Sequence, residues 1–172
     1  MLIDIDKIPR DGLTVDRDFE YSNVELVEED AVFVRPVHVE LIVTKIDEQI
    51  RIKGRIATLL RFNCGRCLTP FEYPIDSRFD LVYLPEELEE MKEELGEEDI
   101  NTFYYAAPQL DLRQIVLEQL NLTLPLRPLC SEDCPGICPV CGAVIRDGAC
   151  SCTVPGADPR LESLKSPMKD KK

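Results

Sequence analysis

The chain has 172 residues, of which 44% are hydrophobic and 31% are charged, and this composition is typical of a globular domain rather than of a disordered chain. The formal net charge of −13 argues against nonspecific binding to nucleic-acid phosphates by the surface as a whole. Residues 1–12 lack the pattern of a secretory signal, and no stretch approaches the roughly 18 consecutive apolar residues that span a bilayer. We therefore expect a cytoplasmic protein that does not contact membranes.

The first half of the chain alternates apolar and polar residues with a period of two, which predicts β-strands. The expected strands cover residues 2–5, 30–44, 49–61 and 71–84, with an edge or a bulge at Pro36. The short connections between the last three strands favour an antiparallel arrangement. We expect an α+β protein built mainly on an antiparallel β-sheet, either a meander or a partly open barrel, with one or two helices.

Strand 49–61 is expected to have one apolar and one basic face, because its isoleucines alternate with arginine and lysine. The basic face and the turn that follows it form what we call the basic stripe: Arg51, Lys53, Arg55, Arg61 and Arg66. These residues are candidate contacts for RNA phosphates. The alternative interpretation is that they form the solvated face of a strand.

Two helices are expected in the middle of the chain. Residues 85–95 begin with proline, which favours the first position of a helix, and carry apolar residues at helical spacing. The overlapping stretch 86–99 contains nine acidic residues and one lysine, which is typical of a solvated face. After a short expected strand at 101–105, Asp111 predicts the N-cap of the second helix, with Gln114 as its capping-box partner.

The eight cysteines fall into four closely spaced pairs: Cys64 and Cys67, Cys130 and Cys134, Cys138 and Cys141, Cys150 and Cys152. A reducing cytoplasm disfavours disulfides, whereas two pairs of thiolates complete the tetrahedron of a closed structural zinc site. Glycine lies inside the first of these turns and directly after the third, where tight turns need it. We therefore expect two structural Zn²⁺ ions.

The spacing favours one division of the thiols over another. The last two pairs lie close enough to form a local site, which leaves the first two pairs to form a second site that joins the C-terminal module to the sheet. The rival division places Cys130, Cys134, Cys138 and Cys141 on one ion. Arg66, Arg127 and Arg146 lie within a few residues of the pairs, either as donors to sulfur or as plain surface residues.

The sequence offers no catalytic constellation. The single histidine, His38, lies inside a strand pattern, so a catalytic thiol has no evident base. A site closed by four cysteines leaves no open position for a catalytic water, and no phosphate-binding glycine loop is present. We expect a non-enzymatic protein with three parts: a β-rich α+β domain at 1–126, a cysteine-rich zinc knuckle or ribbon at 127–153, and a tail at 154–172 with one helical turn near 161–165.

Four segments in order, NCGRCLTPFEYPI, LDLRQIVLEQLNLTLPLRPLC, EDCPGICPVCG and DPRLESLK, resemble the YceD family, the large ribosomal RNA subunit accumulation proteins of bacteria and plastids. The resemblance extends from about residue 32 to 165. It implies a non-enzymatic accessory factor in ribosome biogenesis that supports the synthesis, processing or stability of large-subunit (23S) rRNA. Its partner would be ribosomal RNA or a pre-ribosomal particle, contacted directly or through a protein.

A second hypothesis places the protein in a different class. An acidic protein with an exposed knuckle is suited to hold a basic ribosomal protein or an assembly factor without touching RNA itself. The acidic stretch 86–99 is the feature that distinguishes this adaptor hypothesis from direct RNA binding.

Overall fold

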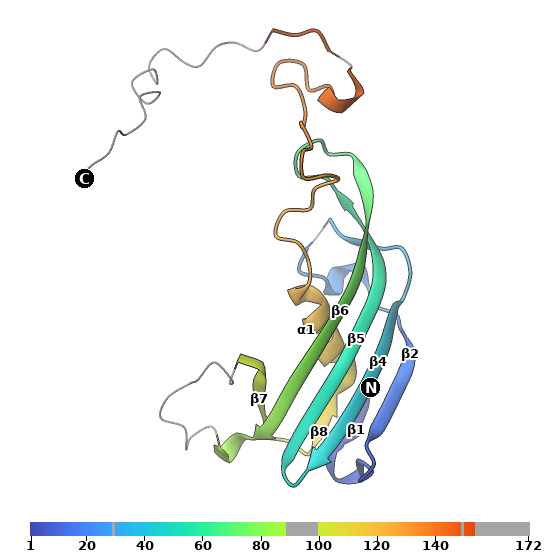
Figure 1. The fold of residues 1–172 in the computed structure, drawn as a ribbon, viewed down its shortest axis with the longest axis vertical. Helices are drawn as coiled ribbons and strands as arrows, with labels where there is room; N and C mark the ends of the chain where they lie inside the picture. Colours follow the sequence, from blue (N-terminus) through green and yellow to red (C-terminus); the bar gives the residue numbers. More distant parts are fainter. Residues whose placement is uncertain (29, 89–99, 149, 154–172) are drawn as a thin grey trace, which may run out of the picture.

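The computed structural model of the chain describes residues 1–28, 30–88, 100–148 and 150–153. Its main element is a six-stranded sheet in the order β2–β4–β5–β6–β7, with β3 paired to β5 (Figure 1). The strands are β1 (Leu2–Asp4), β2 (Leu13–Phe19), β3 (Val32–Phe33), β4 (Val37–Ile46), β5 (Gln49–Asn63), β6 (Pro70–Pro85), β7 (Thr102–Tyr105) and β8 (Gln109–Asp111). The helices are α1 (Leu112–Leu122) and the short 3₁₀ turns η1 (Ile5–Lys7), η2 (Asn23–Glu25), η3 (Glu86–Leu88) and η5 (Ile145–Asp147).

The predicted antiparallel meander is confirmed in β4, β5 and β6. Each pairs antiparallel with the next over most of its length, and β5 and β6 form a hairpin of 15 and 16 residues that extends past the end of β4. The turn of this hairpin lies away from the body of the sheet, and residues 130–153 follow it there (Figure 1). The length of the hairpin therefore decides where the cysteines lie.

The sheet is mainly antiparallel, as expected, but it differs from the expectation in its details. The sheet is open, with β2 and β7 at its edges, rather than a partly open barrel. β7 pairs parallel with β6, which makes the sheet mixed, and β1 pairs with β8 in a separate two-stranded sheet. β2 was not expected, although Val15 and Phe19 are buried at even spacing within it.

The strand expected at 30–44 is divided in two. β3 and β4 are separated at residues 34–36, where Pro36 has no N–H to donate to a ladder. The hydroxyl of Thr58, which is 3% exposed, donates to the carbonyl oxygens of Arg35 (3.0 Å) and Pro36 (3.3 Å). A buried side chain of β5 thus provides hydrogen bonds that the interrupted strand lacks, which agrees with the irregularity predicted at Pro36.

The core lies between α1 and one face of the sheet, and α1 is behind β4–β6 in Figure 1. Ile50, Ile52 and Ile56 are fully buried there, as the alternation predicted. Asp111 caps α1 by accepting a hydrogen bond from the N–H of Arg113 (3.0 Å). The expected capping box is wrong, because Gln114 Nε2 donates to Glu118 (3.1 Å) instead.

Residues 85–88, the described part of the helix expected at 85–95, do not form an α-helix. Pro85 does not begin a helix but is the last residue of β6, where it pairs with Tyr105, and η3 follows as a single 3₁₀ turn. The remainder of the expected helix, 89–95, lies outside the described residues, as does the helical turn expected at 161–165.

Candidate metal centres

The turn between β5 and β6 holds Cys64 and Cys67. The N–H of Leu68 donates to the carbonyl of Cys64 (2.9 Å), and the N–H of Cys64 donates to the carbonyl of Thr69 (3.0 Å). These bonds close a tight loop in which both thiols are buried. The turn predicted here is confirmed.

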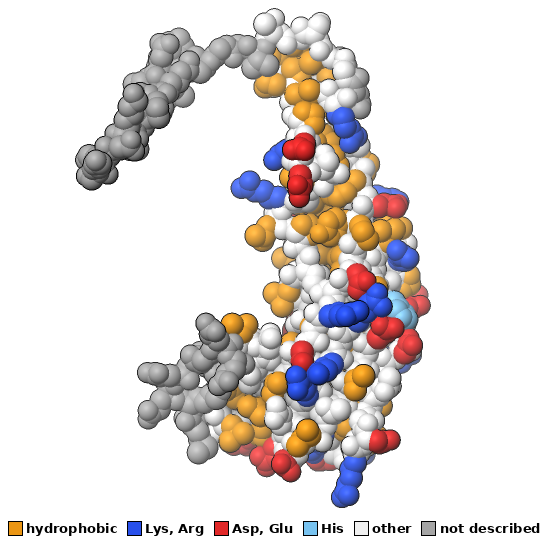
Figure 2. Space-filling view, in the orientation of Figure 1, with side chains coloured by type: hydrophobic (Ala, Val, Ile, Leu, Met, Phe, Trp, Pro, Cys, Tyr) orange, Lys and Arg blue, Asp and Glu red, His pale blue; other side chains and the backbone are white. Residues whose placement is uncertain are grey.

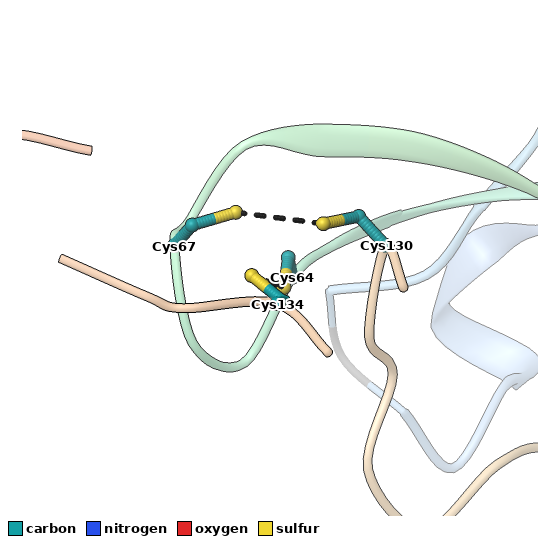
Figure 3. Close-up of side chains that lie close together, drawn as sticks. All are labelled: Cys64, Cys67, Cys130 and Cys134. Atoms are coloured by element: carbon teal, nitrogen blue, oxygen red, sulfur yellow. Dashed lines mark hydrogen bonds between the residues drawn. The ribbon is translucent and has the colours of Figure 1, made fainter. Parts of the chain in front are cut away.

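The segment after α1 brings two further thiols to this turn. The N–H of Gly65 donates to the carbonyl of Pro128 (2.8 Å), which places Cys130 beside the turn. The sulfur of Cys130 lies 3.7 Å from that of Cys67, and the sulfur of Cys134 lies 3.8 Å from that of Cys64 (Figure 3). We call the four residues the first centre.

The first centre has the dimensions of a four-thiolate metal site. All four sulfurs lie within 4.8 Å of one another. Four sulfurs bound at about 2.3 Å to one ion in a tetrahedron lie about 3.8 Å apart, close to both sulfur distances given above, whereas a disulfide would require about 2.0 Å. Four cysteine ligands in this arrangement are found in structural zinc sites and in iron–sulfur centres.

Cys138, Cys141, Cys150 and Cys152 form the second centre, and their sulfurs also lie within 4.8 Å of one another. The N–H of Gly142 donates to the carbonyl of Cys138 (2.8 Å), and Gly142 has a φ of 74°, which glycine adopts without strain. Unlike the first centre, this one is open to solvent, because Cys141 and Cys152 are exposed. The thiols are thus grouped as the spacing favoured, and the rival division is not the one observed.

Backbone N–H groups favour ionisation of one thiol in each centre. Burial by itself would raise the pKa of Cys64, but the N–H groups of Cys130, Cys67 and Arg66 lower it to about 6. The N–H groups of Cys141 and Val140 lower the pKa of Cys138 to about 7. Such N–H donors stabilise thiolate, which is the form that binds metal.

Two of the three nearby arginines contact the first centre. Arg146 Nη1 lies 3.6 Å from the sulfur of Cys130, so the expected donation to sulfur is present at that position. Arg66 Nη1 instead donates to the carbonyl oxygens of Glu132 and Cys134, both at 3.0 Å. Arg66 therefore joins the hairpin turn to the C-terminal module through the backbone.

The basic stripe is paired with carboxylates along most of its length. Arg51 donates two hydrogen bonds to Asp80 (2.7 and 2.6 Å), and Arg55 donates two to Asp76 (2.8 and 2.6 Å). The remaining pairs are longer: Lys53 with Asp80 at 3.7 Å, Arg55 with Glu40 at 3.6 Å, and Arg61 with Glu72 at 3.4 Å. Figure 2 shows red and blue side chains side by side over this part of the sheet.

Sequence reasoning missed the acidic partners of the stripe, although the signal was present. Asp76 and Asp80 alternate with apolar residues along β6, so they share a face of that strand. The register places Lys53 opposite Asp80, and this register could not be read from either strand alone. Arg66 lies beyond the paired strands and forms no ion pair with any described residue.

His38 lies in β4, as expected from the strand pattern, and its side chain is exposed. Its Nδ1 lies 2.9 Å from Asp18 Oδ1 on β2, and its Nε2 lies 3.6 Å from Asp16 Oδ1. The hydrogen bond with Asp18 raises the pKa of His38, and the charges of Asp16 and Glu40 act in the same direction. No described cysteine sulfur is among the contacts of His38.

Within the described residues, no helix is both long and apolar enough to cross a membrane.

The comparisons with known proteins identify a family. The family model described as "Large ribosomal RNA subunit accumulation protein YceD" matches residues 52–166, about two thirds of the chain, and this range contains all eight cysteines. No solved structure matches the chain.

Curated relatives come from bacteria and plants. An uncharacterized protein of Mycobacterium tuberculosis is 31% identical over 104 residues, which cover 60% of this chain and 48% of the relative. Large ribosomal RNA subunit accumulation protein YCED homolog 1, chloroplastic, is 25% identical in Zea mays (78% of this chain, 53% of the relative) and 26% identical in Arabidopsis thaliana (68% and 44%). The chain thus spans about half the length of these relatives. From the extent of the family match, the chain belongs to the YceD family.

Proposed function

We propose that this protein is a non-enzymatic accessory factor in ribosome biogenesis that supports the accumulation of large-subunit (23S) rRNA. The observation that carries the proposal is the family match over residues 52–166, which contains both cysteine centres and most of the β5–β6 hairpin. We place the activity in the cytoplasm, where free thiols persist. Its partner is ribosomal RNA or a pre-ribosomal particle.

In this proposal each cysteine centre binds one structural zinc ion. Bound zinc supplies a rigid crosslink between four thiolates and has no open position for a substrate. At the first centre, Cys64 and Cys67 of the hairpin would hold the same ion as Cys130 and Cys134 of the C-terminal module. The second centre would close the module on itself. The four cysteines of the first centre would thus fix the orientation of the C-terminal module relative to the β5–β6 hairpin.

A second candidate function is that of an adaptor that holds a basic ribosomal protein or an assembly factor without touching RNA. The ion pairs of the basic stripe favour it, because they weaken the case for direct RNA contact. Arginines that already donate two hydrogen bonds to aspartate offer little to a phosphate. This favours the solvated-face interpretation of Arg51, Lys53, Arg55 and Arg61, and an acidic protein can instead hold a basic ribosomal protein.

A depletion strain tests the proposal. Cells that lose their own copy should accumulate less mature 23S rRNA relative to 16S rRNA, and the intact gene should restore the ratio. A gene with Arg51, Lys53 and Arg55 all changed to Gln should also restore it if the stripe is only a solvated face, and Gln avoids placing new negative charges against Asp76 and Asp80. An unchanged rRNA ratio after complete depletion would refute the proposed function.

A further inference from the structure

The turn between β5 and β6 places a leucine in a backbone conformation that glycine adopts more readily. Leu68 has a φ of 60°, in the left-handed region that leucine enters only against steric strain. Its side chain is 65% exposed, so burial in the core does not compensate for the strain. Strain that persists without internal compensation is found at functional sites.

The second centre shows that the turn does not require leucine. Gly142 occupies the same position after its cysteine pair, with a φ of 74°, and its N–H donates to Cys138 as that of Leu68 donates to Cys64. The two turns therefore share their hydrogen bonding, and glycine meets the conformational demand without strain. Leucine at position 68 has a role other than closing the turn.

Two arginines lie in the segments that meet at this turn. Arg66 is in the turn itself, and Arg127 directly precedes Pro128, whose carbonyl accepts from the N–H of Gly65 (2.8 Å). Arg127 is exposed and makes no hydrogen bond or ion pair with any residue that the structure describes. Residues 62–71 and 124–130 contain no Asp or Glu, and the nearest acidic residues in the sequence beyond them are Glu72, which pairs with Arg61, and Glu132, whose carbonyl accepts from Arg66.

The surface around this turn differs from the rest of the sheet. Along the basic stripe each guanidinium or ammonium group of β5 has a carboxylate partner. Figure 2 shows more hydrophobic surface over the upper part of the molecule, with basic and acidic side chains among it, whereas charges of both signs cover the lower sheet. The hairpin turn combines an exposed apolar side chain with two arginines that form no ion pair with any carboxylate in the described part of the chain.

We infer that Leu68, Arg66 and Arg127 form a contact site for single-stranded RNA. An unstacked base offers an apolar face to Leu68, and the adjacent phosphates attract the two guanidinium groups. A duplex is disfavoured because its base faces are stacked and cannot reach a single leucine. This inference rests on the proposed role in rRNA accumulation and gives the class of RNA that the protein would contact.

Fluorescence anisotropy of the full zinc-loaded chain tests the inference. The probes are a fluorescent single-stranded RNA of mixed sequence and the same sequence as a duplex, each measured over a series of salt concentrations. Leu68→Gly should weaken single-strand binding about fivefold or more without lowering Tm, since glycine relieves the strain. Leu68→Asn, which also tolerates the left-handed region, should weaken it similarly. Arg127→Gln should reduce the salt slope of log K by about 0.7.

Arg78→Gln is the matched control, because Arg78 is an exposed arginine on the outer face of β6, away from the turn. It should leave single-strand binding unchanged. The inference is overturned if Leu68→Gly binds as well as the unsubstituted chain, if it lowers Tm as loss of a packed residue would, or if the duplex binds equally well. Absence of any RNA binding would also overturn it, while a fall in 23S rRNA on depletion would still support the proposed function.

Discussion

The sulfur atoms of Cys64 and Cys134 lie 3.8 Å apart although 70 positions separate the two residues in the chain. This contact joins the turn of the β5–β6 hairpin to the segment that follows α1. It makes the position of the C-terminal module depend on a long-range contact at the first centre. A metal ion held there would close one of the longest loops in the protein.

The first prediction concerns metal content and the attachment of the module. The purified chain should contain two zinc ions, one for each centre, by elemental analysis. Cys64→Ser should reduce this to one and speed chymotryptic cleavage after Leu129, which packs against the first centre, because the module is no longer joined to the hairpin. Cys141→Ser is the control, and it should leave cleavage after Leu129 unchanged. An unchanged cutting pattern for Cys64→Ser would refute the role of the first centre as a clamp.

The two centres should differ in reactivity. Cys64, Cys67 and Cys134 are at most 3% exposed, whereas Cys141 and Cys152 are exposed. A chelator combined with a thiol alkylating reagent should therefore label the second centre first, as read from peptide masses over time. Labelling of the first centre at the same rate would contradict the burial of its thiols.

His38 should titrate above its ordinary pKa of about 6.5 in NMR spectra, because Asp18 and the nearby carboxylates favour the protonated ring. Since the folded pKa is raised, the stabilisation is complete below the unfolded pKa and is lost as pH rises through the folded pKa. Asp18→Asn should lower the pKa of His38 more than Asp16→Asn does, because Asp16 lies farther away. Equal effects of the two substitutions would contradict the assigned cause.

Thr58→Val should lower the free energy of unfolding by about 1–3 kcal/mol, measured by denaturant titration. The substitution keeps the shape of the side chain but removes the donor that satisfies the carbonyl groups of Arg35 and Pro36. Thr44→Val on β4 serves as the control, because its hydrogen bond to Arg51 is long, at 3.5 Å, and exposed. The control should change stability by less than about 0.5 kcal/mol. A similar loss in both variants would contradict the role of Thr58 at the strand break.

The local features of this protein follow from its sequence. Alternation of Ile50, Ile52 and Ile56 with charged residues predicts β5 and its buried face, because side chains of a strand point to opposite sides in turn. The spacing of two residues inside Cys64–Cys67 and Cys138–Cys141 predicts tight turns with neighbouring thiols. The division of the eight thiols into two groups of four was predicted by counting cysteine pairs, since a structural zinc site takes four ligands.

Only the tertiary structure decided features that depend on partners distant in the chain. The register of β5 on β6 sets Arg51 and Arg55 within reach of Asp80 and Asp76, which turns an expected basic surface into one of ion pairs. The pairing of β1 with β8 also depends on residues more than 100 positions apart. A sequence pattern specifies which side of a strand is apolar, but the packing of the whole core selects the neighbouring strand and the register. A shift of the register by one residue would turn the buried side chains of that strand toward solvent.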